Sequence, residues 1–135
     1  MAQNSPGRIR HPFTRVTTAL AEANYVTTAR ATESVQTLAD GANIAWNLSR
    51  GGQAKVTLGG NRTLDNPISM VAGAQYSLRI IQDGTGSRTL AYGTAYLWPK
   101  DVSPTLTTTA SATDVLTFLC DGTNMIATAG VFDSK

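Results

Sequence analysis

The sequence has few of the residues from which cross-links, metal centres and catalytic sites are made. Its 135 residues include one cysteine and one histidine, and 15% are charged, against roughly 25% in a typical soluble domain. One cysteine cannot form an intrachain disulfide. One cysteine and one histidine cannot supply the ligands of a structural zinc site. We therefore expect no metal and no cofactor.

Long apolar runs are also missing. None approaches the roughly 18 residues of a membrane span. The N-terminus has no apolar stretch after its basic residues, as a secretory signal would require. We expect a chain that is used without export through a signal peptide and that has no membrane partner.

Small and β-branched residues dominate instead. Threonine occurs 20 times, accompanied by many serine, glycine and alanine residues. Threonine favours strands, whereas long helices are built from glutamate, lysine, leucine and arginine. The composition predicts an all-β protein with an uncharged polar surface.

Charge divides the chain into two parts. Residues 35–135 carry seven basic and seven acidic groups, so the net charge of +2 belongs to residues 1–34. That excess is too small for a nucleic-acid footprint. We expect residues 1–34 to form an N-terminal arm and residues 35–135 a β-sandwich domain. The arm is either a flexible terminus or a segment that becomes ordered against a mildly acidic protein surface.

Short strands with frequent turn signals predict the sandwich. Apolar residues alternate with polar ones, as at Ile44, Trp46 and Leu48, and Gly or Pro breaks recur about every 8 to 12 residues. Two hairpins are expected. One joins residues 76–82 to 88–92 through a Gly-containing loop, and the other joins 114–120 to 124–128 through Asp121-Gly122-Thr123.

The strand at residues 115–120 departs from simple alternation. Leu116, Phe118 and Cys120 form one apolar face, yet Val115 and Leu119 are apolar on the other. The outer face of a half-exposed strand is normally polar. We expect Val115 and Leu119 to be covered either by another segment of the same chain or by another subunit.

The sequence offers little for catalysis. His11 lies in the arm, and Cys120 lies on the apolar face of a strand, where a small core residue is expected. The aspartates stand mostly at turns, where they cap backbone N–H groups. Paired carboxylates of a glycosidase remain an alternative. The prediction is that the protein is not an enzyme.

Several segments resemble a module of tailed-bacteriophage virion proteins. They run over about residues 42–130 and are Val56 to Leu64, Gln75 to Leu90, Leu97-Trp98-Pro99, Pro104 to Thr107, Asp114 to Phe118 and Asp121-Gly122. The module recurs in tail fibres, head fibres and capsid decoration (cement) proteins. The resemblance implies a jelly-roll-like antiparallel β-sandwich that works as a homotrimer without enzymatic activity. In such a trimer, Val115 and Leu119 would lie at the trimer interface.

Two virion roles follow from the resemblance. With only about 34 residues before the module, we expect a trimeric decoration protein, made in the host cytoplasm, that stabilises the outer surface of the phage head. Its arm would bind the phage major capsid protein through Arg8, Arg10, Phe13 and Arg15. The alternative is a tail-fibre or head-fibre adhesin that contacts a host receptor or glycan through Tyr92, Tyr96 and Trp98.

Overall fold

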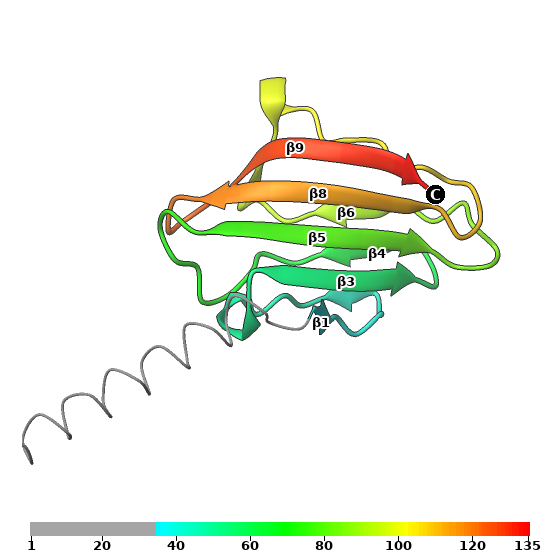
Figure 1. Cartoon of the computed structure of the whole chain (residues 1–135), viewed down its shortest axis with the longest axis horizontal. Coiled ribbons are helices and arrows are strands. Elements are labelled where there is room, and N and C mark those ends of the chain that lie inside the picture. Colours follow the sequence, from blue (N-terminus) through cyan, green and yellow to red (C-terminus); the bar gives the residue numbers. More distant parts are fainter. Residues whose placement is uncertain (1–34) are drawn as a thin grey trace, which may run out of the picture. The chain divides into compact units, whose positions relative to one another are not determined.

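A computed structural model describes residues 35–135, which contain nine strands and two short 3-10 helices (Figure 1). In chain order these elements are β1 (Gln36–Thr37), β2 (Asn43–Ile44), η1 (Leu48–Arg50), β3 (Gln53–Leu58), β4 (Arg62–Leu64), β5 (Gln75–Gln82), β6 (Leu90–Tyr92), β7 (Tyr96–Leu97), η2 (Pro99–Asp101), β8 (Thr113–Cys120) and β9 (Met125–Ser134). The all-β class expected from composition is confirmed for these residues.

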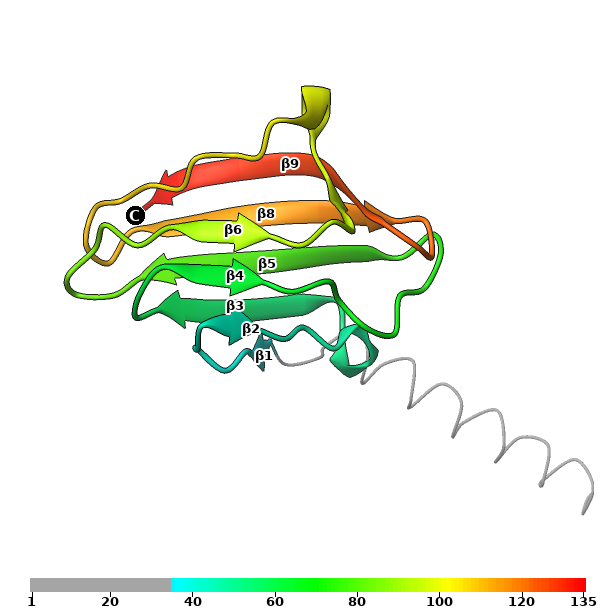
Figure 2. The ribbon, with the colours of Figure 1, turned by 180° about the vertical axis from the view of Figure 1, so that it is seen from behind.

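The strands form two facing sheets. The larger has the order β1-β3-β5-β8-β9-β7, and the smaller has the order β2-β4-β6. Figure 2 shows the smaller sheet in front of the larger one. From β1 to β6 the chain moves alternately between the two sheets, so each strand lies parallel to the strand two positions before it. A parallel pair needs a crossover connection, and here the strand in the opposite sheet supplies it.

This topology corrects the expected antiparallel jelly roll. Only β5 with β8 and β8 with β9 are antiparallel pairs among the described strands. The hairpin predicted for residues 76–82 and 88–92 is wrong, because β5 and β6 belong to different sheets. Local alternation marks where strands lie but does not reveal which strands pair. The second predicted hairpin is confirmed, since Cys120 lies opposite Met125.

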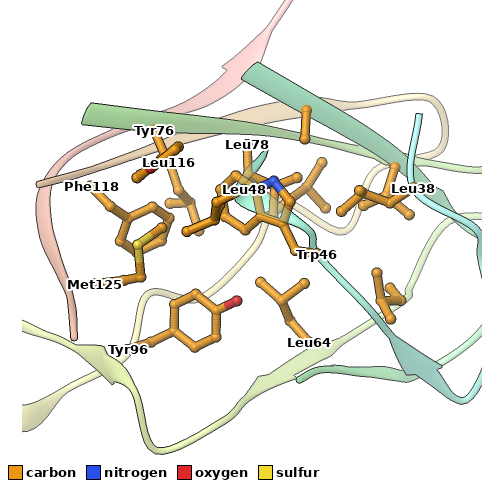
Figure 3. Close-up of a cluster of buried hydrophobic side chains, with 14 of the residues drawn as sticks. Leu38, Trp46, Leu48, Leu64, Tyr76, Leu78, Tyr96, Leu116, Phe118 and Met125 are labelled. Atoms are coloured by element: carbon orange, nitrogen blue, oxygen red, sulfur yellow. The ribbon is translucent and has the colours of Figure 1, made fainter. Parts of the chain in front are cut away.

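The core lies between the sheets (Figure 3). Alternate residues of β3, β5 and β8 point inward, including Val56, Leu78 and Phe118, each no more than 2% exposed. Burial of such a side chain contributes about 1.5–3 kcal/mol. Trp46 packs edge-on against Tyr76 and Phe118. The core position expected for Cys120 is also confirmed, because Cys120 is 1% exposed.

Candidate functional site

The outer face of β8 carries the apolar residues that the sequence singled out. The side chains of Asp114, Leu116, Phe118 and Cys120 are buried, whereas those between them face away from the core. Val115 is half-buried and Leu119 is 38% exposed. Within residues 35–135, Leu119 is therefore only partly covered by the chain itself.

Strand pairing extends these positions into two apolar rows. Leu97 of β7 lies beside Ile126 of β9, which lies opposite Leu119. In the second row, Val131 of β9 lies opposite Val115. Directly paired residues point to the same side of a sheet. Leu97, Val115, Leu119, Ile126 and Val131 thus form one patch, which we call the β8–β9 face.

The edge of β9 adjoins this face. Strand β7 pairs with β9 only at Met125 and Ile126, and no other described strand lies along β9 beyond β8. The segment from Met125 through Phe132 contains no charged residue. An uncharged strand edge of this kind is open to pairing with another chain, and native monomers usually blunt such edges.

The inner side of β9 is also partly uncovered. A groove of about 230 Å³ runs between β9 and the segment from Trp98 to Pro104. Phe132 on β9 is 41% exposed and Val102 in the segment is 68% exposed. Apolar side chains therefore surround β9 on its outer face, at its edge and in this groove, a combination that marks contact surfaces.

Polar and charged residues border the β8–β9 face. Across the large sheet, Val115 lies opposite Arg79 of β5, and Arg79 lies beside Lys55 of β3. Gln75 lies opposite Leu119 at the end of the other row. An apolar centre with a polar rim is the usual anatomy of a protein–protein interface.

The aromatic residues predicted to contact a receptor lie against one another. Tyr96 is 4% exposed, and its hydroxyl donates a hydrogen bond of 2.9 Å to the carbonyl oxygen of Asp65. The ring of Trp98 lies 4.6 Å from that of Tyr92 and 5.6 Å from that of Phe118. Burial raises the pKa values of Tyr92 and Tyr96 well above the ordinary value of 10.0.

This packing places Tyr96 away from any surface ligand. Its ring belongs to the core cluster, and Tyr92 and Trp98 lie against that cluster, partly buried. Apolar side chains gain more by packing in a core than by remaining in water. Receptor contact through Tyr92 and Trp98 stays a prediction.

The carboxylates hold loops and turns. Asp114, 2% exposed, accepts hydrogen bonds from the backbone N–H groups of Thr107 and Asp133. Asp40 pairs with Arg62, and Asp83 pairs with Arg88. Asp121 accepts the N–H groups of the turn between β8 and β9. These roles are structural, as expected for aspartates at turns.

Two kinds of feature are absent from the described residues, a metal site and a membrane-spanning helix. No group of three or more His, Cys, Asp or Glu side chains among residues 35–135 could hold a metal ion. In the same part of the chain, no helix is long and apolar enough to cross a membrane. The predicted capsid-docking residues Arg8, Arg10, Phe13 and Arg15 lie outside the described residues.

Sequence reasoning missed part of the β8–β9 face. It identified Val115 and Leu119 but not Leu97, Ile126 or Val131. The predicted turn at residues 121–123 contained the signal, because a hairpin closed there sets Ile126 opposite Leu119. No comparable signal in the sequence places Leu97 beside Ile126, because a long stretch of chain separates β7 from β9.

An all-β domain with an exposed apolar sheet face and structural carboxylates is typical of a component that works by assembly. Residues 49–125 match the model of a family described as "Putative phage tail fibre C-terminal domain". The match covers more than half of the chain, so the chain belongs to this family and is a phage structural protein. Neither the curated proteins nor the solved structures gave a match.

The family confirms the coarser part of the expectations. The resemblance to phage virion modules holds, and the protein is a virion component. The family points to the tail fibre, which was the alternative, rather than to decoration of the capsid. It is a family of structural domains, in line with the prediction that the protein is not an enzyme.

Proposed function

We propose that this protein is a tail-fibre domain that assembles into a homotrimer through the β8–β9 face and presents other surfaces to the host receptor. The observation that carries the proposal is the pair of apolar rows, Leu97–Ile126–Leu119 and Val131–Val115. The copy number of three comes from the resemblance to trimeric virion modules.

Assembly explains why these residues are apolar. Ile126 and Leu119 are 37% and 38% exposed, and Val131 is 57% exposed. Covering apolar surface contributes roughly 25 cal/mol for each Å² removed from water. A neighbouring subunit would also pair or shield the edge of β9, which removes the risk of uncontrolled strand addition.

Capsid decoration has less support. That hypothesis depends on Arg8, Arg10, Phe13 and Arg15, which lie outside the described residues. The family match favours the tail fibre. The two roles share the trimer but differ in its place on the virion.

A charge placed on the β8–β9 face tests the assembly. In Leu119→Arg, a cation enters the apolar row beside Ile126, and we expect the trimer to dissociate at micromolar concentration because a buried unpaired charge is costly. Sedimentation equilibrium gives the mass, and circular dichroism checks that the strands remain. The reference chain mass is 14.2 kDa.

Thr57→Arg is the matched control. Thr57 is exposed on β3 in the same sheet, away from both apolar rows. We expect this variant to remain trimeric. A wild-type protein that sediments as a monomer, or a Leu119→Arg variant that stays trimeric, would contradict assembly through this face.

A further inference from the structure

The segment that follows β7 holds an apolar side chain out in solvent. Val102 is 68% exposed, the largest fraction among the large apolar side chains of residues 35–135. Figures 1 and 2 show the turn that contains η2, drawn in yellow, projecting beyond β9. The N–H of Val102 donates a hydrogen bond of 3.1 Å to the carbonyl oxygen of Pro99. Lys100 in this turn has a φ of 56°, a strained conformation of the kind that gathers at functional sites.

A small pocket lies on the outer face of the large sheet. Val115 points outward from β8, and Arg79, its partner on β5, points to the same side. The pocket has a volume of about 140 Å³, the share of about five water molecules in the liquid. A short branched aliphatic side chain fits such a space. The lining residues are Val35, Gln53, Ala54, Ser77, Arg79 and Val115.

The lining residues of this outer-face pocket differ in depth. Ala54 is 2% exposed, and Ser77 and Val115 are half-buried, whereas Gln53 and Arg79 are exposed at the rim. Contacts at the centre of an interface carry most of its energy, and contacts at the rim are close to neutral. Because Val115 also belongs to the β8–β9 face, the pocket continues the surface assigned to assembly.

Strand register places the projecting turn and the pocket at the same level along the strands. Val102 lines the groove beside β9 together with Ala129 and Gly130. Ala129 lies opposite Thr117 of β8, and Thr117 lies opposite Ser77 of β5, which lines the pocket. A rotation about an axis parallel to the strands keeps this level, so it can carry the turn of one copy to the pocket of the next.

A ring of identical subunits needs two different surfaces that fit each other. In a cyclic trimer, each subunit offers one patch to the subunit before it and another to the subunit after it. The groove with Val102 is on the inner side of β9, and the pocket is on the outer face of the same sheet. The sheet therefore separates Val102 from the pocket of its own chain.

We infer that Val102 of each subunit inserts into the outer-face pocket of the next subunit, in a contact that closes after three copies. The inference rests on the proposed function and adds the second surface that assembly needs. The neighbouring turn then covers Val115 from outside, which explains an apolar side chain at this outward position.

Disulfide trapping in the full chain tests the contact. In the double variant Val102→Cys/Ser77→Cys, we expect oxidation to link the subunits into a species of three times the chain mass of 14.2 kDa on a non-reducing gel. A disulfide forms only between residues whose Cα atoms lie within about 7 Å. Each single variant should stay unlinked, because Val102 meets Ser77 and not its own copy. The native Cys120 is 1% exposed and should not react.

Val102→Cys/Thr57→Cys is the matched control for the trapping. Thr57 is exposed on β3 in the same sheet but does not line the pocket. We expect this variant to form the trimer without the disulfide link.

Removal of the projecting side chain gives a second measurement. In Val102→Ser, we expect the midpoint concentration of trimer dissociation, measured by sedimentation, to rise at least about tenfold, because each subunit loses the burial of an apolar side chain. Ile68→Ser is its control, since Ile68 is 60% exposed and lines neither the pocket nor the groove beside β9. That variant should dissociate as the wild type does.

Three results would overturn the inference. They are a double variant without the linked trimer, a link in the Val102→Cys single variant, or an unchanged midpoint in Val102→Ser. The second result would mean that two projecting turns meet each other. Sedimentation of the reduced double variant separates the two levels of the account. A trimer that gives no link refutes this contact alone, whereas a monomer refutes the proposed assembly as well.

Discussion

Asp83 illustrates how single residues of this chain are used. Its Oδ1 atom accepts the N–H groups of Thr85 and Gly86 at 3.1 and 2.9 Å, and its Oδ2 atom lies 2.9 Å from Nη2 of Arg88. The hydrogen bond with Arg88, followed by the backbone bonds, lowers the pKa of Asp83 below its ordinary value of 3.8. The carboxylate therefore fixes the loop that leaves β5.

The lowered pKa gives a dependence of stability on pH. The unfolded chain binds the proton at about 3.8 and the folded chain only at lower pH, so the stabilisation is present above 3.8 and is lost as pH falls through the lower pKa. In Asp83→Asn, we expect lower stability at neutral pH and a smaller loss on acidification. Urea unfolding from neutral pH to below 3.8 measures both effects.

Asp101→Asn is the control for that measurement. Asp101 is the exposed last residue of η2 and has no side-chain hydrogen bond among the described residues. The free energy of unfolding of Asp101→Asn should depend on pH as that of the wild type does. If the free energies of unfolding of Asp83→Asn and the wild type fall in parallel across the acid range, the pair with Arg88 does not stabilise the fold.

At the scale of elements, one buried side chain joins three segments. Gln82 at the end of β5 is 3% exposed. Its Nε2 group donates to the carbonyl oxygens of Arg88 and Thr107 at 2.9 and 2.8 Å, and its Oε1 atom accepts the N–H of Arg88 at 2.9 Å. The loop after β5 and the segment before β8 are thereby held to the same strand end.

Replacing this side chain should destabilise the domain. Gln82→Met keeps the length of the side chain but leaves three backbone groups without partners, and we expect a loss of about 2–4 kcal/mol in the free energy of unfolding. Gln53→Met, an exposed position at the start of β3, should change it by less than about 0.5 kcal/mol. Equal stability of the two variants, measured by chemical denaturation, would contradict this role of Gln82.

Strand positions could be predicted from the sequence, but strand partners could not. Alternation located the inward residues of β3, β5 and β8, because a half-buried strand repeats every two residues. The turn at Asp121 revealed the β8–β9 hairpin because both strands adjoin it. The parallel pairing of β3 with β5 joins residues across an intervening strand of the other sheet, and no local pattern encodes that contact.

The same limit applies to the candidate interface. Val115 and Leu119 could be recognised as unusual because they broke a local alternation. Ile126 and Leu97 join them only through pairing between strands.

At the scale of the whole molecule, the fold, the β8–β9 face and the family match all support a structural role in the phage tail. A domain with structural carboxylates and an apolar β8–β9 face belongs to a family of phage tail fibre domains. In the proposed account, the β8–β9 face joins the subunits of a fibre, and other surfaces of the domain meet the host.

The position of the protein on the virion tests the central claim most directly. Antibody-gold labelling of intact phage particles, with antibodies raised against this chain, shows by electron microscopy where it lies. The account predicts label at the fibres of the tail and none on the head. Label distributed over the head surface would contradict the tail-fibre assignment and restore capsid decoration.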